Sequence, residues 1–315
     1  MPESNQSLLQ RADLAIADLN ANGGLLDPEQ ANTFIDIIME QPTILRQSRI
    51  IRMNAPSRKI NKIGFANRIL RAARTQGSAN DDGSNDRYVR KADRAAPTTS
   101  QIRLDTEEVI AEVRLPYEIF EDNIEGESLE GHIMRLIAER AAIDLEELAL
   151  AADKSSPDDY LALHDGWLKR MNVNVVHNAA AGVSPDMFTN GLLTMPQKYL
   201  RNLNQLRHVV SVANTIHYRN KVSKRATEYG DTALTQNNPL YAGGVAIEAA
   251  PMLAAVGSGN MGFLTFMQNL IFGIQRDIRV ETDRDIRSRE FIIVLTARVA
   301  LQIEDIDATV KYTNI

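Results

Sequence analysis

The stretch REFIIVLTARVALQIED, residues 289–305, decides the fold of the C-terminal part of the chain. Apolar side chains occupy every second position from residue 293 to residue 303. This two-residue period is typical of a strand that buries one face. Residues 277–282 have strand composition too, and charged residues separate the two segments. We therefore predict a long antiparallel hairpin, followed by a last strand at 308–312.

Residues 128–153 carry the clearest helical pattern in the chain. The apolar residues that share one face are Leu129, Ile133, Leu136, Ile137, Ala141, Leu145, Leu148 and Ala152. This spacing predicts a single amphipathic helix about 39 Å long, with acidic residues on its other faces. Apolar and charged side chains alternate over 107–115, which predicts a half-buried strand just before the helix.

The remaining segments predict an arm and a second domain. Residues 7–19 and 28–41 have helical spacing. These two short helices cannot bury their apolar faces by themselves, so we expect them to form an arm that packs against another part of the protein or another molecule. After residue 184 the predicted helices are 184–194 and 215–227, and the predicted strands are 208–212, 244–248 and 262–266. This order of short elements predicts an α+β domain.

A basic segment lies between the arm and the strand at 107–115. Its sequence, ILRQSRIIRMNAPSRKINKIGFANRILRAAR (residues 44–74), holds nine Lys or Arg residues and no Asp or Glu, although the 315-residue chain has a formal net charge of -6. Residues 48–53 and 60–65 are rich in β-branched side chains, with Pro56-Ser57 between them, and predict a β-ribbon. The polar, glycine-rich residues 75–88 predict a loop at its tip.

Composition and motifs exclude several function classes. The chain has no cysteine, which removes disulfides and thiolate metal sites. No apolar run is long enough to span a bilayer, and the N-terminus does not look like a secretory leader, so we expect a protein of the cytoplasm. GSGNMG at 257–262 matches a dinucleotide-binding pattern, but the residues after it have strand composition. His164-Asp165 is the only local acid–base pair, and a structural hydrogen bond explains it better. We therefore expect no enzyme, and no catalytic, cofactor-binding or metal-binding residues.

Charge is sorted along the chain. Residues 104–153 hold fifteen Asp or Glu and three Arg, whereas the basic segment before them (residues 44–74) has no acidic residue. The ribbon could bind nucleic acid, but it has one aromatic residue, Phe65, and an acidic neighbour that would repel a polyanion. It could fold back on its own helix, or bind the acidic surface of another copy. We favour the third reading, in which charges select the partner and apolar side chains supply most of the affinity.

Two groups of residues would make this contact between copies. The basic group is Arg49, Arg52, Arg58, Lys59, Lys62, Arg68, Arg71 and Arg74. The acidic group is Glu121, Asp122, Glu125, Glu127, Glu130, Glu139, Glu146 and Glu147. Because the two groups lie on different surfaces, such a contact builds rings or shells.

The order of these parts resembles the major capsid protein of tailed double-stranded DNA bacteriophages, the Hong Kong 97 fold. Several stretches are similar to that family in sequence as well: GGLLDPEQANTFIDIIMEQPTIL, SPDMFTNGLLTMPQKYL, NPLYAGGVAIEAAPML, and the tail from GFLTFMQNLIFGIQRDIRV to the end. The resemblance implies an N-terminal arm (1–45), an extended loop (46–106), a peripheral domain (107–180 plus 276–306) and an axial domain (181–275 plus 307–315). The peripheral domain would contain the long spine helix and the β-hairpin.

The resemblance also implies a function and partners. Subunits would form hexamers and pentamers, close into an icosahedral procapsid in the bacterial host cytoplasm, and mature into the virion head around double-stranded DNA, without sequence-specific binding and without a membrane. A separate scaffolding protein, a portal and decoration proteins are the expected partners. Some members join subunits covalently through lysine and asparagine side chains, but no motif here identifies a partner for Lys59 or Lys62, so the sequence does not predict whether a cross-link forms. The alternative is an encapsulin, a cellular shell of the same fold with an enzyme as cargo.

Overall fold

The computed structural model describes residues 44–65, 69–70, 96–116, 128–179, 182–224, 239–256, 260–275 and 279–315. The helices predicted at 7–19 and 28–41 and the loop tip at 75–88 lie outside these residues. The chain divides into two compact units, residues 57–104 and the remainder. We call the first unit the ribbon and the second the body.

The body contains helices and strands in alternation. Its helices are α4 (Ser128–Ala151), α5 (Trp167–Arg170), α6 (Pro185–Thr194) and α7 (Val212–Ser223). Its 3₁₀ helices include η2 (Leu161–Leu163), η3 (Gln197–Gln205), η4 (Pro251–Ala254), η6 (Met267–Asn269) and η7 (Ile306–Ala308). Its strands are β1 (Arg49–Met53), β4 (Glu107–Pro116), β5 (Val175–His177), β6 (Leu206–Val210), β7 (Tyr241–Ala242), β8 (Val245–Ala249), β9 (Met261–Phe266), β10 (Leu270–Gln275), β11 (Arg279–Asp285), β12 (Glu290–Ile303) and β13 (Thr309–Thr313).

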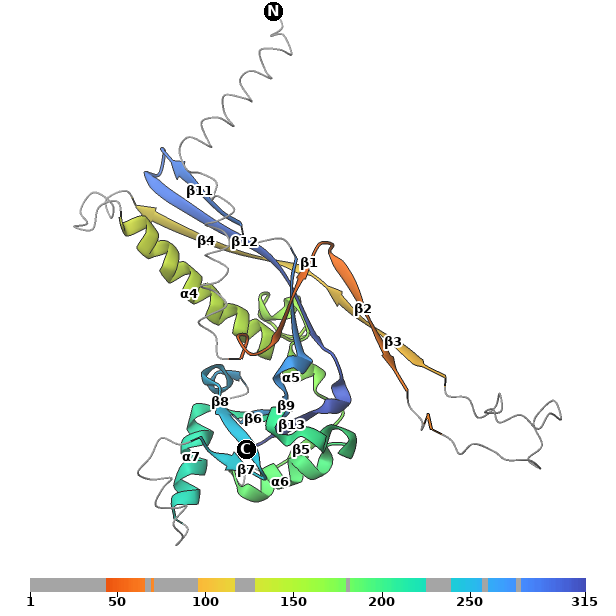
Figure 1. The fold of residues 1–315 in the computed structure, drawn as a ribbon. Coiled ribbons are helices and arrows are strands. Elements are labelled where there is room, and N and C mark those ends of the chain that lie inside the picture. Colours follow the sequence, from red (N-terminus) through yellow and green to blue (C-terminus); the bar gives the residue numbers. More distant parts are fainter. Residues whose placement is uncertain are drawn as a thin grey trace, which may run out of the picture. The chain divides into compact units, whose positions relative to one another are not determined.

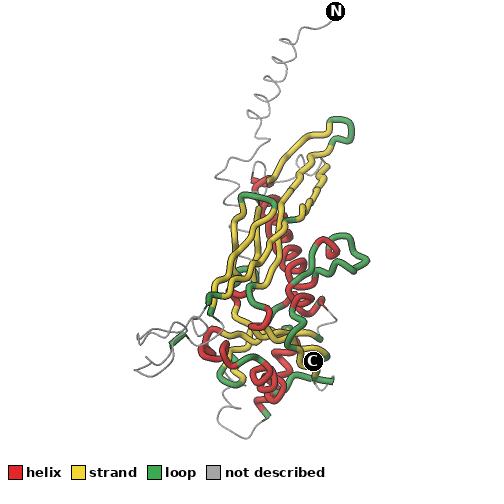
Figure 2. The backbone as a smooth tube through the Cα atoms, turned by 90° about the vertical axis from the view of Figure 1, so that its right-hand side faces the viewer, coloured by secondary structure: helices red, strands yellow, loops and turns green. Residues whose placement is uncertain are grey.

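The first sheet is built around β12, the strand predicted from its alternating pattern. β12 pairs with β11 in an antiparallel hairpin, as the sequence predicts, and β4 and β10 also pair with it. β1 joins the edge of β10 in parallel. Helix α4 lies along the sheet in both backbone views (Figures 1 and 2). Helix α4 confirms the long amphipathic helix predicted at 128–153, although Leu136, expected on the apolar face, is 51% exposed.

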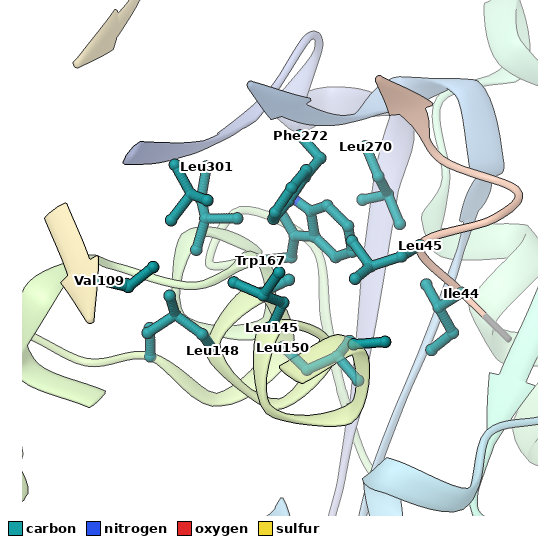
Figure 3. Packing of buried hydrophobic residues seen from close by; sticks show 14 of the residues in the cluster. Ile44, Leu45, Val109, Leu145, Leu148, Leu150, Trp167, Leu270, Phe272 and Leu301 are labelled. Carbon is teal, nitrogen blue, oxygen red and sulfur yellow. The ribbon is translucent and has the colours of Figure 1, made fainter. Parts of the chain in front are cut away.

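The core between α4 and this sheet centres on Trp167, the only tryptophan, which is fully buried. Figure 3 shows its ring among leucine side chains from α4, β10 and β12. The indole N–H donates to the backbone oxygens of Gln302 (3.1 Å) and Ile271 (3.4 Å), so its polar atom is satisfied. Gly166 precedes it because an added Cβ would lie 2.8 Å from the backbone nitrogen of Ala152. Each fully buried large apolar side chain stabilises such a core by about 1.5–3 kcal/mol.

The second sheet has the strand order β5-β13-β9-β6-β8-β7, and α6 and α7 belong to the same part of the body. Ser184 and Ser211 cap these two helices, each accepting a hydrogen bond from a backbone N–H in the first turn. The predicted α+β arrangement after residue 184 and the last strand at 308–312 are thereby confirmed. A separate cluster of buried side chains fills this region, with Phe188, His208 and Tyr312 at its centre.

The ribbon pairs differently from the prediction. The strands predicted at 48–53 and 60–65 both form, but they do not pair with each other. β1 lies in the body, and β2 (Ser57–Gly64) instead pairs with β3 (Thr98–Asp105) in a two-stranded sheet. The compact unit that contains β2 and β3 spans residues 57–104.

Two more strands lie in a different sheet from the one that the predicted domain limits imply. β10 was placed with the axial domain but pairs with β12 in the first sheet, and β5 was placed with the peripheral domain but pairs with β13 in the second. Both pairings join residues far apart in sequence.

Candidate inter-subunit surface

The ribbon presents basic and apolar side chains to solvent. Six of the eight residues of β2 are exposed. Arg58 and Lys59 are among them, whereas Lys62 is half-buried. Among its apolar side chains, Ile63 is 73% exposed and Phe65 is 52% exposed. Leu70, further along the basic segment, is 83% exposed. Exposed apolar side chains that gather into one patch mark a contact with another molecule.

A depression of about 290 Å³ lies between α4 and the first sheet, and we call it the α4–β4 groove. Its lining residues are Val109, Ile110, Ala111, Ala141, Asp144, Leu145, Glu147, Tyr160, Leu295 and Ala297. Its walls are mainly apolar, and the carboxylates come from α4. Ile110 is 69% exposed on β4, so apolar surface continues out of the groove.

Tyr160 closes one part of the groove. Its hydroxyl donates to the backbone oxygen of Asp144 at 2.8 Å. Burial, followed by the neighbouring carboxylates of Asp144 and Glu147, raises the pKa of Tyr160, so the phenol stays neutral. Arg140 pairs with Asp144 at 3.0 Å, whereas Glu147 makes no ion pair with any residue that the structure describes. The groove therefore keeps an acidic character.

The three predicted acidic residues whose side chains are described do not share one surface. Glu139 and Glu147 are half-buried on α4, but Glu146 is only 2% exposed. This burial in its own chain argues against the predicted contact of Glu146 with another copy. Its carboxylate instead accepts a hydrogen bond from the backbone N–H of Ile44 (3.3 Å), where the buried Ile44 and Leu45 enter the core.

Arg49 also departs from the prediction. It lies on β1 in the body and pairs with Glu304 of its own chain at 2.9 Å, with both side chains partly exposed. A charge that already has a partner in its own chain is a poor candidate for selecting another copy. Arg52, on the same strand, is exposed.

Several predicted contact residues are not described. Arg68, Arg71, Arg74, Glu121, Asp122, Glu125 and Glu127 lie outside the described residues, and for Glu130 only the helical backbone is described. Sequence reasoning also missed Ile110 and the groove. The available signal was the position of Ile110 within β4, where it interrupts the alternation by placing an apolar residue on the exposed face.

No feature of an enzyme site emerges from the described residues. They contain no group of three or more His, Asp or Glu side chains that could hold a metal ion, and none of their helices combines the length and hydrophobicity needed to cross a membrane. The end of GSGNMG runs into strand β9 instead of the helix that a dinucleotide site requires. His164 is buried, and its Nε2 lies 2.9 Å from the backbone oxygen of Val299, the structural hydrogen bond that the sequence favoured.

Comparison with known proteins gives a consistent picture. No family model matches the chain. A protein of Bacillus subtilis (strain 168) named "Putative prophage capsid protein YqbE" is 39% identical over 319 residues, covering 99% of this chain and 99% of that protein. Among solved structures, the satellite phage P4 procapsid including size determination (Sid) protein has a TM-score of 0.62 at 12% identity, covering 99% of this chain and 98% of its own.

Two further structures bear on the alternatives. The structure named for Microbacterium phage Oxtober96 has a TM-score of 0.61 at 12% identity over 87% of this chain and 91% of its own. The SrpI encapsulin of Synechococcus elongatus PCC 7942 has a lower TM-score, 0.57, at 10% identity over 86% of each chain. At such identities these likenesses concern the fold, which is a mixed helix-and-sheet fold shared with phage capsid structures.

Proposed function

The chain belongs to the family of the prophage capsid protein YqbE, and from this premise we propose that it is a major capsid protein of the Hong Kong 97 type. Copies assemble as hexamers and pentamers into an icosahedral shell around double-stranded DNA. The observation that carries the proposal is the full-length similarity to one capsid protein at 39% identity. Homology to a capsid protein implies a structural role.

The parts of the chain take the roles that such a shell requires. In this proposal residues 1–45 are the N-terminal arm, and the ribbon is the extended loop. The first sheet with α4 is the peripheral domain, and the second sheet with α6 and α7 is the axial domain that faces the centre of each capsomer. Assembly takes place in the host cytoplasm with a scaffolding protein and a portal, and the product is part of the virion.

The contact between copies joins the ribbon of one subunit to the α4–β4 groove of the next. Charge favours this occupant over the N-terminal arm: residues 1–43 hold seven Asp or Glu and one Arg, whereas residues 46–74 hold nine Lys or Arg and no acid. Each exposed ion pair is worth about 0.2–1 kcal/mol. Burying an isoleucine or leucine side chain contributes about 1.5–3 kcal/mol, so Ile63 and Leu70 carry more of the affinity than the charges do.

Electron microscopy of the purified full-length chain tests the function. Closed shells are expected, and a monomer of 35.0 kDa in size-exclusion chromatography as the only species would contradict the proposal. Ultraviolet absorbance and gel analysis of particles made in the phage-producing host then separate the two shell functions. A phage capsid contains genomic DNA, whereas an encapsulin co-purifies with a cargo enzyme.

Disulfide trapping tests the contact. Because the chain has no cysteine, an engineered pair is the only source of disulfides. The double substitution Ile63→Cys/Ile110→Cys is expected to give covalent multimers on a non-reducing gel. The control pair is Ile63→Cys/Ile286→Cys. Ile286 is exposed (84%) on the turn between β11 and β12, beyond the end of the β4–β12 pairing at Glu290 and Pro116, whereas Ile110 pairs with Thr296 in its interior. Equal multimer yields from both pairs, or bridges confined to single chains, would refute the assignment.

Charge reversal gives an independent test of the partners. Replacing Arg58, Lys59 and Lys62 with Glu should block shell assembly, and adding Glu139→Lys and Glu147→Lys should partly restore it. Arg49 is left unchanged because its partner is Glu304 of the same chain. If the combined variant assembles no better than the ribbon variant alone, these groups do not face each other.

A further inference from the structure

A second acid-free segment lies in the body, around α7. Residues 187–227 hold seven Lys or Arg residues and no Asp or Glu, in a chain whose formal net charge is -6. The ribbon–groove contact uses none of them. Tyr218 and Val222 bury one face of α7, and basic and amide side chains lie beside that face.

These side chains line a depression of about 480 Å³ next to α7. Helix α7 is labelled in Figure 1. Its lining residues are Gly182, Val183, Asn214, His217, Asn220, Lys221, Lys224, Asn260 and Ile315. Three amides, two ammonium groups and an imidazole therefore face one space, and none of the described residues that line it is an Asp or Glu. Lysine and asparagine side chains together supply many N–H donors for a small anion.

The walls hold these donors in place. The Lys221 ammonium donates to the backbone oxygen of Val183 at 3.3 Å, which leaves further N–H groups for a ligand. Neither Lys221 nor Lys224 forms an ion pair within the part of the chain that the structure describes. Gly182 has a φ of +70° and no atom within 4 Å of where its Cβ would be, so a ligand can approach bare backbone there.

We propose that this depression is a binding site for a phosphate group, recognised by charge and N–H donors without sequence specificity. Lysine is a common phosphate ligand as a point charge, and amide side chains add directed hydrogen bonds. The phosphate could be free or part of a DNA backbone. That DNA is the physiological source rests on the proposed capsid function, whereas the phosphate site itself does not.

Salt-dependent binding of a short DNA duplex of arbitrary sequence to the full-length, unassembled chain tests the proposal. Each phosphate contact adds about 0.9 to the slope of log affinity against log salt. Lys221→Gln/Lys224→Gln should therefore reduce the magnitude of this slope by about 1.8. When the salt concentration is lowered from about 0.2 to 0.05 M, the DNA affinity of this variant should rise about twelvefold less than that of the natural chain. The control, Lys154→Gln/Arg201→Gln, makes the same charge change at exposed positions outside the depression and should leave the slope unchanged.

Asn260→Asp provides a second variant, because it places a carboxylate in the depression while leaving the backbone oxygen that accepts from Ile315. It should weaken DNA binding as the lysine pair does. Equal losses in the lysine pair and the control pair, no loss in either, or full binding by Asn260→Asp would each overturn the proposal.

Inorganic phosphate identifies the source. At constant ionic strength, phosphate should displace DNA from the natural chain, but not from Lys221→Gln/Lys224→Gln, if the site accepts the free ion. Displacement from neither, with the DNA difference intact, assigns the site to backbone phosphates. Shell assembly is not part of either readout, so failure of the capsid proposal and failure of this one are distinguishable.

Discussion

His208 makes the second sheet sensitive to acid. The imidazole is fully buried, its Nδ1 lies 2.9 Å from the Tyr312 hydroxyl, and its ring packs against Phe188. Its Nε2 has no hydrogen-bond partner among the described residues. Burial lowers the pKa of His208 from an ordinary value of 6.5 to about 3. Between about pH 6.5 and pH 3, His208 is protonated in the unfolded chain but stays neutral in the folded chain. The free energy of unfolding therefore decreases as the pH falls through this range.

The magnitude follows from these two pKa values. One pKa unit corresponds to about 1.4 kcal/mol, so lowering the pH from 7 to 5 should cost about 2 kcal/mol through His208 alone. His208→Asn removes the titrating group while keeping a polar side chain near Tyr312. Since the substitution also removes volume, only the difference between the two pH values is compared.

Urea unfolding of the unassembled chain at pH 7 and pH 5 measures this difference, followed by far-UV circular dichroism and by the fluorescence of Trp167. The natural chain should lose about 2 kcal/mol more than His208→Asn over this interval. Burial also lowers the pKa of His164, which adds an acid sensitivity that both chains share and that cancels in the comparison. Equal pH dependence in the two chains would refute the reasoning.

Three further predictions concern the body and the ribbon. Glu146→Ala should lower the free energy of unfolding by about 1–3 kcal/mol, since it leaves the buried Ile44 N–H without an acceptor, and Glu146→Gln should recover most of the loss in urea titrations. Gly191→Ala should cost about 1–3 kcal/mol by overpacking, because the new Cβ would lie 2.6 Å from Cε1 of Tyr312; a wild-type midpoint in urea would contradict this. Trypsin should cleave after Lys59 and Lys62 in the unassembled chain and much more slowly in shells, as mass spectrometry of the fragments would show.

Local patterns were enough to predict most of the elements. The alternation over β12 and the stripe along α4 each repeat many times, so neighbouring residues alone determine the period. Among the side chains that the structure describes, both elements also bury the face that the pattern predicts, apart from Leu136. Long, periodic segments are therefore readable from the sequence because burial of one face is a local property.

Pairing and exposure depended on residues far apart in sequence. β1 looked like half of a hairpin, yet its partner β10 lies more than 200 residues away. The sequence placed Glu146 on a solvated acidic face. In the structure its carboxylate accepts a hydrogen bond from the backbone N–H of Ile44, which lies 102 residues earlier. No local period encodes either contact, which explains why the sequence alone indicated neither the pairing of β1 with β10 nor the burial of Glu146.

The sequence separates a basic segment from an acidic one, but the basic side chains behave differently in the body and in the ribbon. In the body, basic side chains of the first sheet already have partners, as Arg49–Glu304 and Arg298–Glu108 show. The ribbon is a two-stranded sheet whose side chains are mostly exposed, and such a hairpin is marginally stable by itself in water. Ordering the ribbon therefore requires apolar burial that its own two strands do not provide. If a neighbouring copy provides this apolar burial, the same contact both orders the ribbon and joins the two subunits. A shell repeats this contact at every subunit. Many individually weak contacts then add to a particle that cannot dissociate one contact at a time.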